Sequence, residues 1–420
     1  MKKNKHLFIN GPFNILRLEG TVGSVKKVIY LFMDVHMPES SQYKCENPRA
    51  VDIQSFLVFE FERLQKSDPD KMFDFMFERG LLKPHHFANE KVLYLGEISD
   101  LFSKAFKIDL QANRAQSSDL IPNVRFHFID VRDYIMRKSH NVIFHKLQTL
   151  TDTIYADKNY NLKQLKELFD YVQVVQSEFS VVYSLLYKTE KLSNPKISRS
   201  LYSAHMYKMY DISETDNYKL NQKLIYKLLV KYENPAVKEK ITEIINNRVH
   251  DMFIELFDYV DKTLFFINEE IDIIKSYGQH DVSQILLQQS NNTYAYGQDK
   301  KNSLKKIFEI RLIGDNMFKK AFDIGVYLMD LYKLRRMIDK PYIQNIINYA
   351  GGYHSQNYVQ LLVNHFGFKL TNYSYLKNND IKAAEKVIKK TTNPDQLNIL
   401  FFPTLLGQCS DLGSFPKLFY

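Results

Sequence analysis

Residues 28–36, VIYLFMDVH, and residues 346–354, IINYAGGYH, decide the fold of this chain. Each is an apolar run long enough for a strand, and each ends in small or polar residues and a histidine. A nearly continuous apolar run is typical of a strand buried on both faces in a parallel sheet. In α/β proteins, ligands bind at the carboxyl ends of such strands. We therefore expect His36 and His354 at one site, although they lie far apart in the chain.

Two further apolar runs, residues 72–77 and 124–130, also predict buried strands, and polar residues follow each of them. Between these strands, apolar residues recur at helical spacing, at residues 51–65 and 97–110. Strands that alternate with helices are the pattern of a parallel α/β sheet. Shorter strands are expected in residues 6–18, 91–95 and 366–370.

The middle of the chain, from about residue 134 to residue 340, changes to a helical period of apolar residues. Long helices are predicted at residues 162–188, 220–232, 237–276 and 304–336. The polar segment 288–299, QQSNNTYAYGQD, is predicted to be a loop. This pattern indicates a bundle of about five or six helices. The prediction is an α/β domain of residues 1–140 and 341–420, with a mostly parallel sheet, interrupted by an α-helical insertion of residues 141–340.

Composition narrows the class of protein. Of the 420 residues, 45% are hydrophobic, which excludes a disordered chain. The net charge of +9 comes from short, scattered lysine and arginine clusters, which we interpret as solvated helix faces. This charge is the only feature that suggests a nucleic-acid partner, and we do not expect one. No apolar run approaches the roughly 18 residues of a membrane span, and no secretory signal opens the sequence.

The chain has two cysteines, Cys45 and Cys409. Two thiols do not make a disulfide framework, so we expect a reducing, intracellular compartment. Cys45 lies nine residues after His36, yet no local motif marks it as a catalytic nucleophile. The tail, residues 397–420, is apolar but interrupted by glycine and proline. It is predicted to pack as irregular coil, on the body of the protein or on a protein partner.

The side chains at the expected strand ends form a candidate site. The set comprises His36, Glu78, Asp130, Arg132 and His354. Two imidazoles and a carboxylate are a common ligand set for a hydrolytic divalent metal that keeps one position open for water. Glu78 would be a ligand or a general base, Asp130 would belong to the catalytic set, and Arg132 would position an anionic substrate group. The alternative is that each side chain only caps a loop backbone or forms a surface ion pair.

The motif Gly351-Gly352-Tyr353-His354 and the residues that follow it, 355–370, resemble the C-terminal signature of the Tiki/TraB group. In that group a Gly-x-x-His loop precedes a helix and a last strand. Residues 31–36 lie where the group has its first such motif, and residues 73–78 are similar to the strand that ends in its glutamate. The related erythromycin esterase-like and ChaN-like proteins also carry a helical insertion. The resemblance covers about residues 25–135 and 340–375.

This resemblance implies metal-dependent hydrolysis, with zinc, manganese or cobalt held by His36, Glu78 and His354. One departure is Met33, which stands where the first motif has a glycine that admits close backbone approach. The alternative is therefore a catalytically inactive relative that serves as a structural or interaction protein. The bias toward Lys, Asn, Ile and Tyr is similar to that of uncharacterised proteins of large DNA viruses. That likeness implies a location in an infected cell or a virus particle.

Overall fold

The computed structural model describes residues 7–36, 44–78, 93–106, 108–109, 114–115, 118–135, 143–157, 160–187, 214–276 and 293–416. The chain forms two compact units. The α/β unit comprises residues 1–130, 232–240 and 329–420, and the helical unit comprises residues 131–231 and 241–328. The predicted α/β class with a large helical region is confirmed. Residues 329–340 group with the sheet, whereas the sequence boundary assigns them to the insertion.

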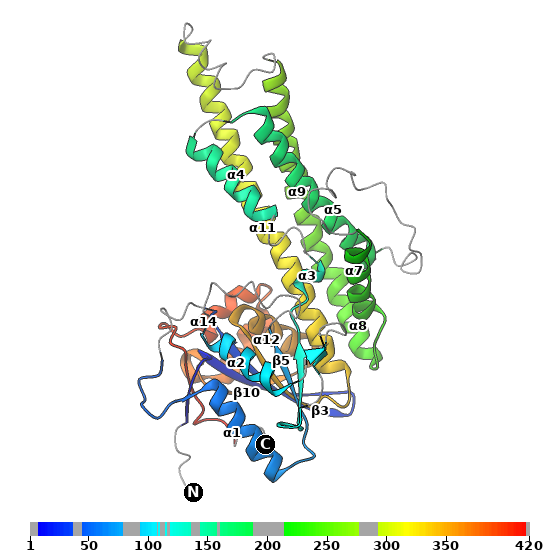
Figure 1. The fold of residues 1–420 in the computed structure, drawn as a ribbon, viewed down its shortest axis with the longest axis vertical. Helices are drawn as coiled ribbons and strands as arrows, with labels where there is room; N and C mark the ends of the chain where they lie inside the picture. The colour runs from blue at the N-terminus through cyan, green and yellow to red at the C-terminus, as the bar shows by residue number, and fades with distance from the viewer. Residues whose placement is uncertain are drawn as a thin grey trace. The chain divides into compact units, whose positions relative to one another are not determined.

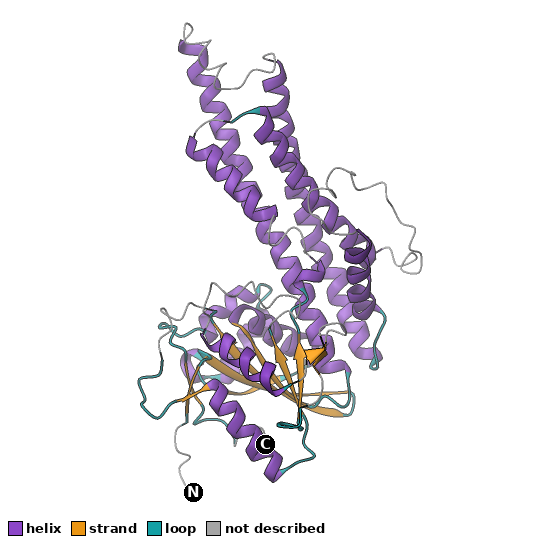
Figure 2. Ribbon diagram, in the orientation of Figure 1, coloured by secondary structure: helices purple, strands orange, loops and turns teal. Residues whose placement is uncertain are grey.

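A six-stranded sheet organises the α/β unit (Figures 1 and 2). Its strands, in the order in which they pair, are β10 (Lys369–Tyr373), β2 (Asn14–Val22), β3 (Val25–Asp34), β9 (Asn345–Gly351), β5 (Phe73–Phe77) and β8 (Val124–Phe128). Strands β3, β9, β5 and β8 are parallel neighbours, and β2 runs antiparallel to both β3 and β10. The sheet is thus mostly parallel, and a strand from the end of the chain lies between two from its beginning.

The register of these strands fixes which ends meet. Asp34 of β3 pairs with Gly351 of β9, and Phe77 of β5 pairs with Tyr349. The carboxyl ends of all three strands therefore lie side by side at one edge of the sheet. The polar residues that follow them are brought to that edge, although the sequence separates them widely.

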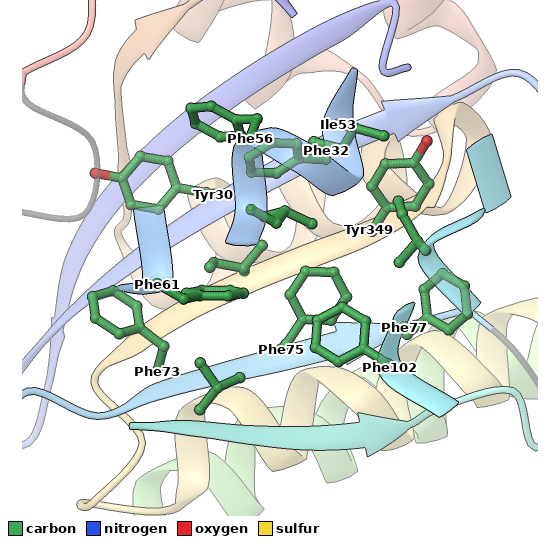
Figure 3. Packing of buried hydrophobic residues seen from close by; sticks show 14 of the residues in the cluster. Tyr30, Phe32, Ile53, Phe56, Phe61, Phe73, Phe75, Phe77, Phe102 and Tyr349 are labelled. Carbon is green, nitrogen blue, oxygen red and sulfur yellow. The ribbon is translucent and has the colours of Figure 1, made fainter. Parts of the chain in front are cut away.

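Aromatic side chains fill one face of the sheet (Figure 3). The helices α1 (Ile53–Ser67) and α2 (Leu93–Ala105) contribute their apolar faces to this core. The ring centroid of Phe102 lies 4.4 Å from that of Phe75 and 4.4 Å from that of Phe126. Such ring pairs contribute about 0.5–1.5 kcal/mol each beyond the burial of their area. Tyr349 of β9 packs in the same core, so alternate residues of β9 point to the other face.

Helix α12 (Gly352–Phe366) follows β9 directly and packs against β3 and β9. It also contacts α13 (Ile381–Lys390), which begins where the Asp380 side chain accepts a hydrogen bond from the Ala383 backbone. Short elements follow in the tail: the 3-10 helices η6 (Lys377–Asn379) and η7 (Pro394–Leu397), and α14 (Asn398–Phe401).

The tail is not irregular coil throughout. Strand β11 (Cys409–Asp411) pairs with β1 (Phe8–Asn10), which also pairs with β4 (Val51–Asp52). A disulfide joins Cys45 to Cys409, so the two cysteines no longer favour the reducing compartment that was expected from them. Their pairing depends on β1 bringing the two ends of the chain together, which cysteine spacing does not show. Tail side chains including Leu412 and Phe415 are buried within the chain, whereas Ile399 and Leu405 are exposed. A protein partner for the tail stays a prediction.

The helical unit holds the remaining helices. They are α3 (Arg132–Ile135), α4 (Phe144–Asp157), α5 (Leu162–Tyr187), α7 (Glu214–Leu229), α8 (Pro235–Ile244), the π-helical turn η4 (Ile245–Val249), α9 (His250–Ser276) and most of α11 (Thr293–Asp339). Residues 235–240 of α8 group with the sheet. A two-stranded ribbon, β6 (Ile108–Asp109) with β7 (Arg114–Ala115), belongs to the α/β unit. Among the described residues, no helix has the length and apolarity that a membrane span requires.

Two local predictions are wrong. The strand expected at residues 91–95 is the start of α2, because Tyr94, Ile98 and Phe102 recur at helical spacing and are buried in the aromatic core. The loop expected at residues 288–299 is helical from Thr293 onward. Extending an existing helix adds one hydrogen bond for each residue fixed, and this outweighs the cost of about 1 kcal/mol at Gly297. Residues 91–92 and 288–292 lie outside the described residues, as do His85 and His86.

Candidate functional site

The structure brings His36, Glu78 and His354 together at the carboxyl edge of the sheet. Glu78 lies between the two histidines: His354 Nε2 is 2.9 Å from its Oε1, and His36 Nε2 is 3.3 Å from its Oε2. We call these three residues the His–Glu–His cluster. The side chains of Glu78 and His354 are almost fully buried, whereas that of His36 is 33% exposed.

Backbone geometry fixes the cluster from one side. The Gly351 backbone N–H donates to Glu78 Oε2 at 2.7 Å. A Cβ on Gly351 would lie 2.9 Å from His36 Nε2, so a glycine is needed there for space. His36 has a φ of 53°, a left-handed conformation that is uncommon outside glycine. The two loops therefore approach each other closely only because one of them lacks a side chain.

A separate buried carboxylate holds the second ring nitrogen of each histidine. Asp34 Oδ2 lies 2.8 Å from His36 Nδ1, and Asp330 Oδ1 lies 2.8 Å from His354 Nδ1. Asp330 also accepts a hydrogen bond of 2.6 Å from Asn357 Nδ2 and another from the Tyr358 hydroxyl. Each imidazole is thus held at both nitrogens, with Nε2 directed at Glu78.

These carboxylates control the protonation of the cluster. Burial lowers the pKa of both histidines, but Asp34 and Glu78 outweigh it and raise the pKa of His36 to about 10. Asp330 and Glu78 likewise raise the pKa of His354 to about 9. Burial raises the pKa of Glu78, but the two imidazoles outweigh it and hold that pKa well below its usual value. At neutral pH the arrangement is a carboxylate between two imidazolium rings.

The sequence missed two charged residues near the cluster, Asp330 and Lys333, both fully buried on α11. They lie one turn apart, and the charge of Glu78 acts on Lys333. The sequence assigned this stretch to the insertion by its apolar period. The sequence feature that could have identified them is an acidic and a basic residue within a helix that is apolar on all sides. Charged residues are almost never buried without partners, so such residues indicate a buried site.

The two other predicted site residues are placed differently. Asp130 follows β8 in the α/β unit, is half-buried, and acts electrostatically on Lys333. Arg132 begins α3, which belongs to the helical unit. The structure thus brings three of the five predicted residues into direct contact, and the catalytic roles of Asp130 and Arg132 stay predictions.

A family model described as "Family of unknown function (DUF5847)" matches residues 7–420. The chain belongs to this family. It is similar to three proteins of Acanthamoeba polyphaga mimivirus. "Uncharacterized protein R706" is 29% identical, and the match covers 98% of this chain and 96% of that protein. "Uncharacterized protein R160" is 27% identical, with 98% and 97% covered, and "Uncharacterized protein R161" is 29% identical, with 98% of each covered.

No solved structure matches this DUF5847 chain. The relationship to the Tiki/TraB group therefore stays a prediction. The mimivirus relatives agree with the coarser expectation of a protein of a large DNA virus.

The imidazole nitrogens and carboxylate oxygens of the cluster are atoms of the types that bind divalent metals. Carboxylates that hold Nδ1, as Asp34 and Asp330 do, are the usual outer partners of metal-binding histidines. The arrangement itself is closed: both oxygens of Glu78 already accept hydrogen bonds. No group of three His, Cys, Asp or Glu side chains in the described part of the chain has the geometry to hold one ion. Metal binding here would need both Nε2 atoms to lose their protons.

Proposed function

We propose that the chain is a metal-dependent hydrolase whose His36, Glu78 and His354 side chains hold a divalent ion. One observation carries the proposal. Two histidines from opposite ends of the chain direct Nε2 at one carboxylate, and each is oriented at Nδ1 by a buried carboxylate of its own. Outer partners of this kind fix the ring orientation and raise the basicity of metal ligands.

A bound divalent ion would supply a Lewis acid and lower the pKa of water at the site. The other tasks belong to the chain. Asp34 and Asp330 orient the two rings, and the Gly351 N–H fixes one oxygen of Glu78. Asn357 and Tyr358 fix Asp330 in turn. The ligands are therefore held by a hydrogen-bonded layer built from three strand ends and two helices.

The test is the metal content of the purified full chain by mass spectrometry. We expect about one equivalent of zinc, manganese or cobalt, and its loss in the His36→Ala, His354→Ala double variant. His145→Ala is the control, because this histidine is exposed on α4. Wild-type protein that holds no metal after loading with each of the three ions would contradict the proposal.

Asp330→Asn gives a finer test, because Asp330 is not itself a predicted ligand. Loss of an outer carboxylate typically weakens metal affinity by about 10- to 100-fold. We expect a loss of that size in a competition titration with a chelator. Unchanged affinity in Asp330→Asn would show that the orientation of His354 does not matter for the metal.

The second candidate is a catalytically inactive relative with a structural or interaction role. Two observations favour it: both oxygens of Glu78 are already bonded, and Met33 is fully buried in β3 where the Tiki/TraB motif has glycine. In that case the cluster is an ion-paired network. Its histidine double variant would leave the buried charge of Glu78 without its two imidazolium partners, at a cost of about 3–5 kcal/mol. A large drop in melting temperature, with no metal in the wild type, would support this second candidate.

A further inference from the structure

In the part of the α/β unit that the structure describes, Lys27 and Lys333 are fully buried, and they are bonded very differently. Lys27 on β3 donates from Nζ to the backbone carbonyls of Met337, at 3.1 Å, and Lys340, at 2.8 Å, and also to that of Ile343. These carbonyls lie at and after the end of α11, where a helix leaves acceptors unpaired. Lys27 therefore has a structural role, because it caps the carbonyl groups at the end of α11.

Lys333 has no such role. Its Nζ has no hydrogen-bond acceptor among the described residues, although the side chain is fully buried. Nζ lies 4.7 Å from the ring centroid of Tyr358, whose hydroxyl bonds to Asp330. A cation–π contact stabilises an ammonium group but leaves its three N–H donors unused. A buried ammonium without acceptors is costly to the fold, so its presence needs an explanation.

Other buried polar groups lie unpaired in the same layer. Both amide atoms of Asn348, and the hydroxyl of Ser355 on α12, lack hydrogen-bond partners within the described residues. Asn348 belongs to β9, whose Ile347 and Tyr349 point into the aromatic core, so it faces the side on which α12 packs. Unsatisfied buried polar groups are rare in folded proteins, and several together mark a place that water or a ligand completes.

We propose that Lys333 binds an anionic oxygen of the substrate, a carboxylate or phosphate oxygen, beside the His–Glu–His cluster. This inference rests on the proposed hydrolase function and names its substrate class. The charged and titratable groups around Lys333 are Glu78, Asp330, Asp130 and Tyr358. Glu78 and Asp330 already accept hydrogen bonds from the cluster and α12. A substrate oxygen would supply the acceptor that Lys333 lacks.

The protonation state of Lys333 is expected to change when an anion binds beside it. Burial lowers its pKa to about 7, although Glu78, Asp330 and Asp130 oppose that change. The amine of the free protein is therefore divided between two protonation states near neutral pH. An anionic oxygen would select the ammonium form, because opposite charges favour the charged state.

The first test compares the melting temperatures of Lys333→Met and Lys27→Met in the full chain. Methionine keeps the length and volume but removes the charge. If Lys333 serves binding, its replacement removes an unsatisfied ammonium, and we expect a higher melting temperature. Lys27→Met is the matched control and should lower it, because three carbonyls lose their donor. A drop in Lys333→Met as large as that in Lys27→Met would make Lys333 structural and overturn the inference.

The second test titrates the wild-type chain with inorganic phosphate and, separately, with acetate, and follows the melting temperature. Ligand that binds the folded state raises it by mass action. We expect one of the two probes to raise the melting temperature of the wild type. The rise should be at least tenfold smaller in Lys333→Met and Lys333→Gln. It should be unchanged in Lys27→Met. The probe that acts identifies the group as phosphate or carboxylate. No stabilisation by either, or an equal effect in the Lys333 variants, would overturn the inference.

The same preparations separate this inference from the proposed function. If Lys333→Met holds metal like the wild type but has lost the anion, both ideas stand. If no preparation holds metal while anion binding depends on Lys333, the anion site stands and the hydrolase proposal fails.

Discussion

His36 illustrates how single residues build the cluster. Asp34 Oδ2 accepts a hydrogen bond from the backbone N–H of His36, two residues further on, and lies 2.8 Å from its Nδ1. This local loop turns the chain into the left-handed conformation and directs the ring at Glu78. The sequence placed a histidine at the strand end. The residues that orient it are found only in the folded chain.

Gly351→Ala tests the close approach of the two loops. The added Cβ would lie 2.9 Å from His36 Nε2 and 3.4 Å from Glu78 Oε2, so the imidazole would have to move. We expect a loss of about 1–3 kcal/mol in the free energy of unfolding, measured by denaturant titration. Metal affinity, where metal is found, should fall in the same variant.

Gly96→Ala is the matched control, because a Cβ there meets no atom within 4 Å and the residue lies inside α2. An interior helical alanine should stabilise by about 0.5–1 kcal/mol. Equal stability of Gly351→Ala and the wild type would show that the space at Gly351 is not needed.

At the scale of elements, β5 and β8 are joined by a second buried network. Asp74 on β5 binds Arg125 through both oxygens, at 2.8 and 2.6 Å, and lies 2.7 Å from His127 Nε2. Arg336 of α11 donates to the other ring nitrogen of His127 at 3.0 Å. That donation leaves His127 neutral with its proton on Nε2. The network therefore connects two strands to the end of the long helix.

This network predicts a dependence of stability on pH. Burial raises the pKa of Asp74, but hydrogen bonds from Arg125 and His127 outweigh it and lower that pKa. A carboxyl whose folded pKa lies below its unfolded value of about 3.9 stabilises the fold above that value and ceases to do so as the pH falls through the folded pKa. We expect the difference in melting temperature between the wild type and Asp74→Asn to be constant above about pH 5 and to shrink below about pH 4.

Asp70→Asn is the control for general acid effects, because Asp70 is exposed just before β5. Its melting curve should follow that of the wild type at every pH. A difference for Asp74→Asn that stayed constant down to pH 2 would show that the ion pair does not set the folded pKa.

Elements with strong local patterns were predicted well from the sequence. Strand β5 occupies residues 73–77 against 72–77 expected, and α1 occupies residues 53–67 against 51–65 expected. The predictions failed at the start of α11, where a polar segment continues the helix, and at the start of α2, where the surrounding core decides. Short apolar runs fit a strand or a helix equally, and only the core that buries them distinguishes the two.

For the whole molecule, the disulfide between Cys45 and Cys409 is a long-range constraint, with a separation of 364 residues in sequence. In the chain-entropy model, closing a loop of this length restricts the unfolded chain and stabilises the fold by roughly 6 kcal/mol. We expect a reductant, or the Cys45→Ser, Cys409→Ser double variant, to lower the melting temperature of the α/β unit. Reductant should not affect the double variant further. An unchanged melting temperature on reduction would contradict a stabilising role for this bond.

The sequence by itself determined the α/β class, the helical middle of the chain, and the placement of His36, Glu78 and His354 at strand ends. These features are local, since they follow from the spacing of apolar residues and the points where that spacing stops. Tertiary structure alone decided that β9 lies between β3 and β5, that Asp330 contacts His354 while Lys333 contacts the Tyr358 ring, and that the two cysteines meet. Those outcomes depend on strand order and register, which join residues hundreds apart, and many arrangements satisfy the same local pattern.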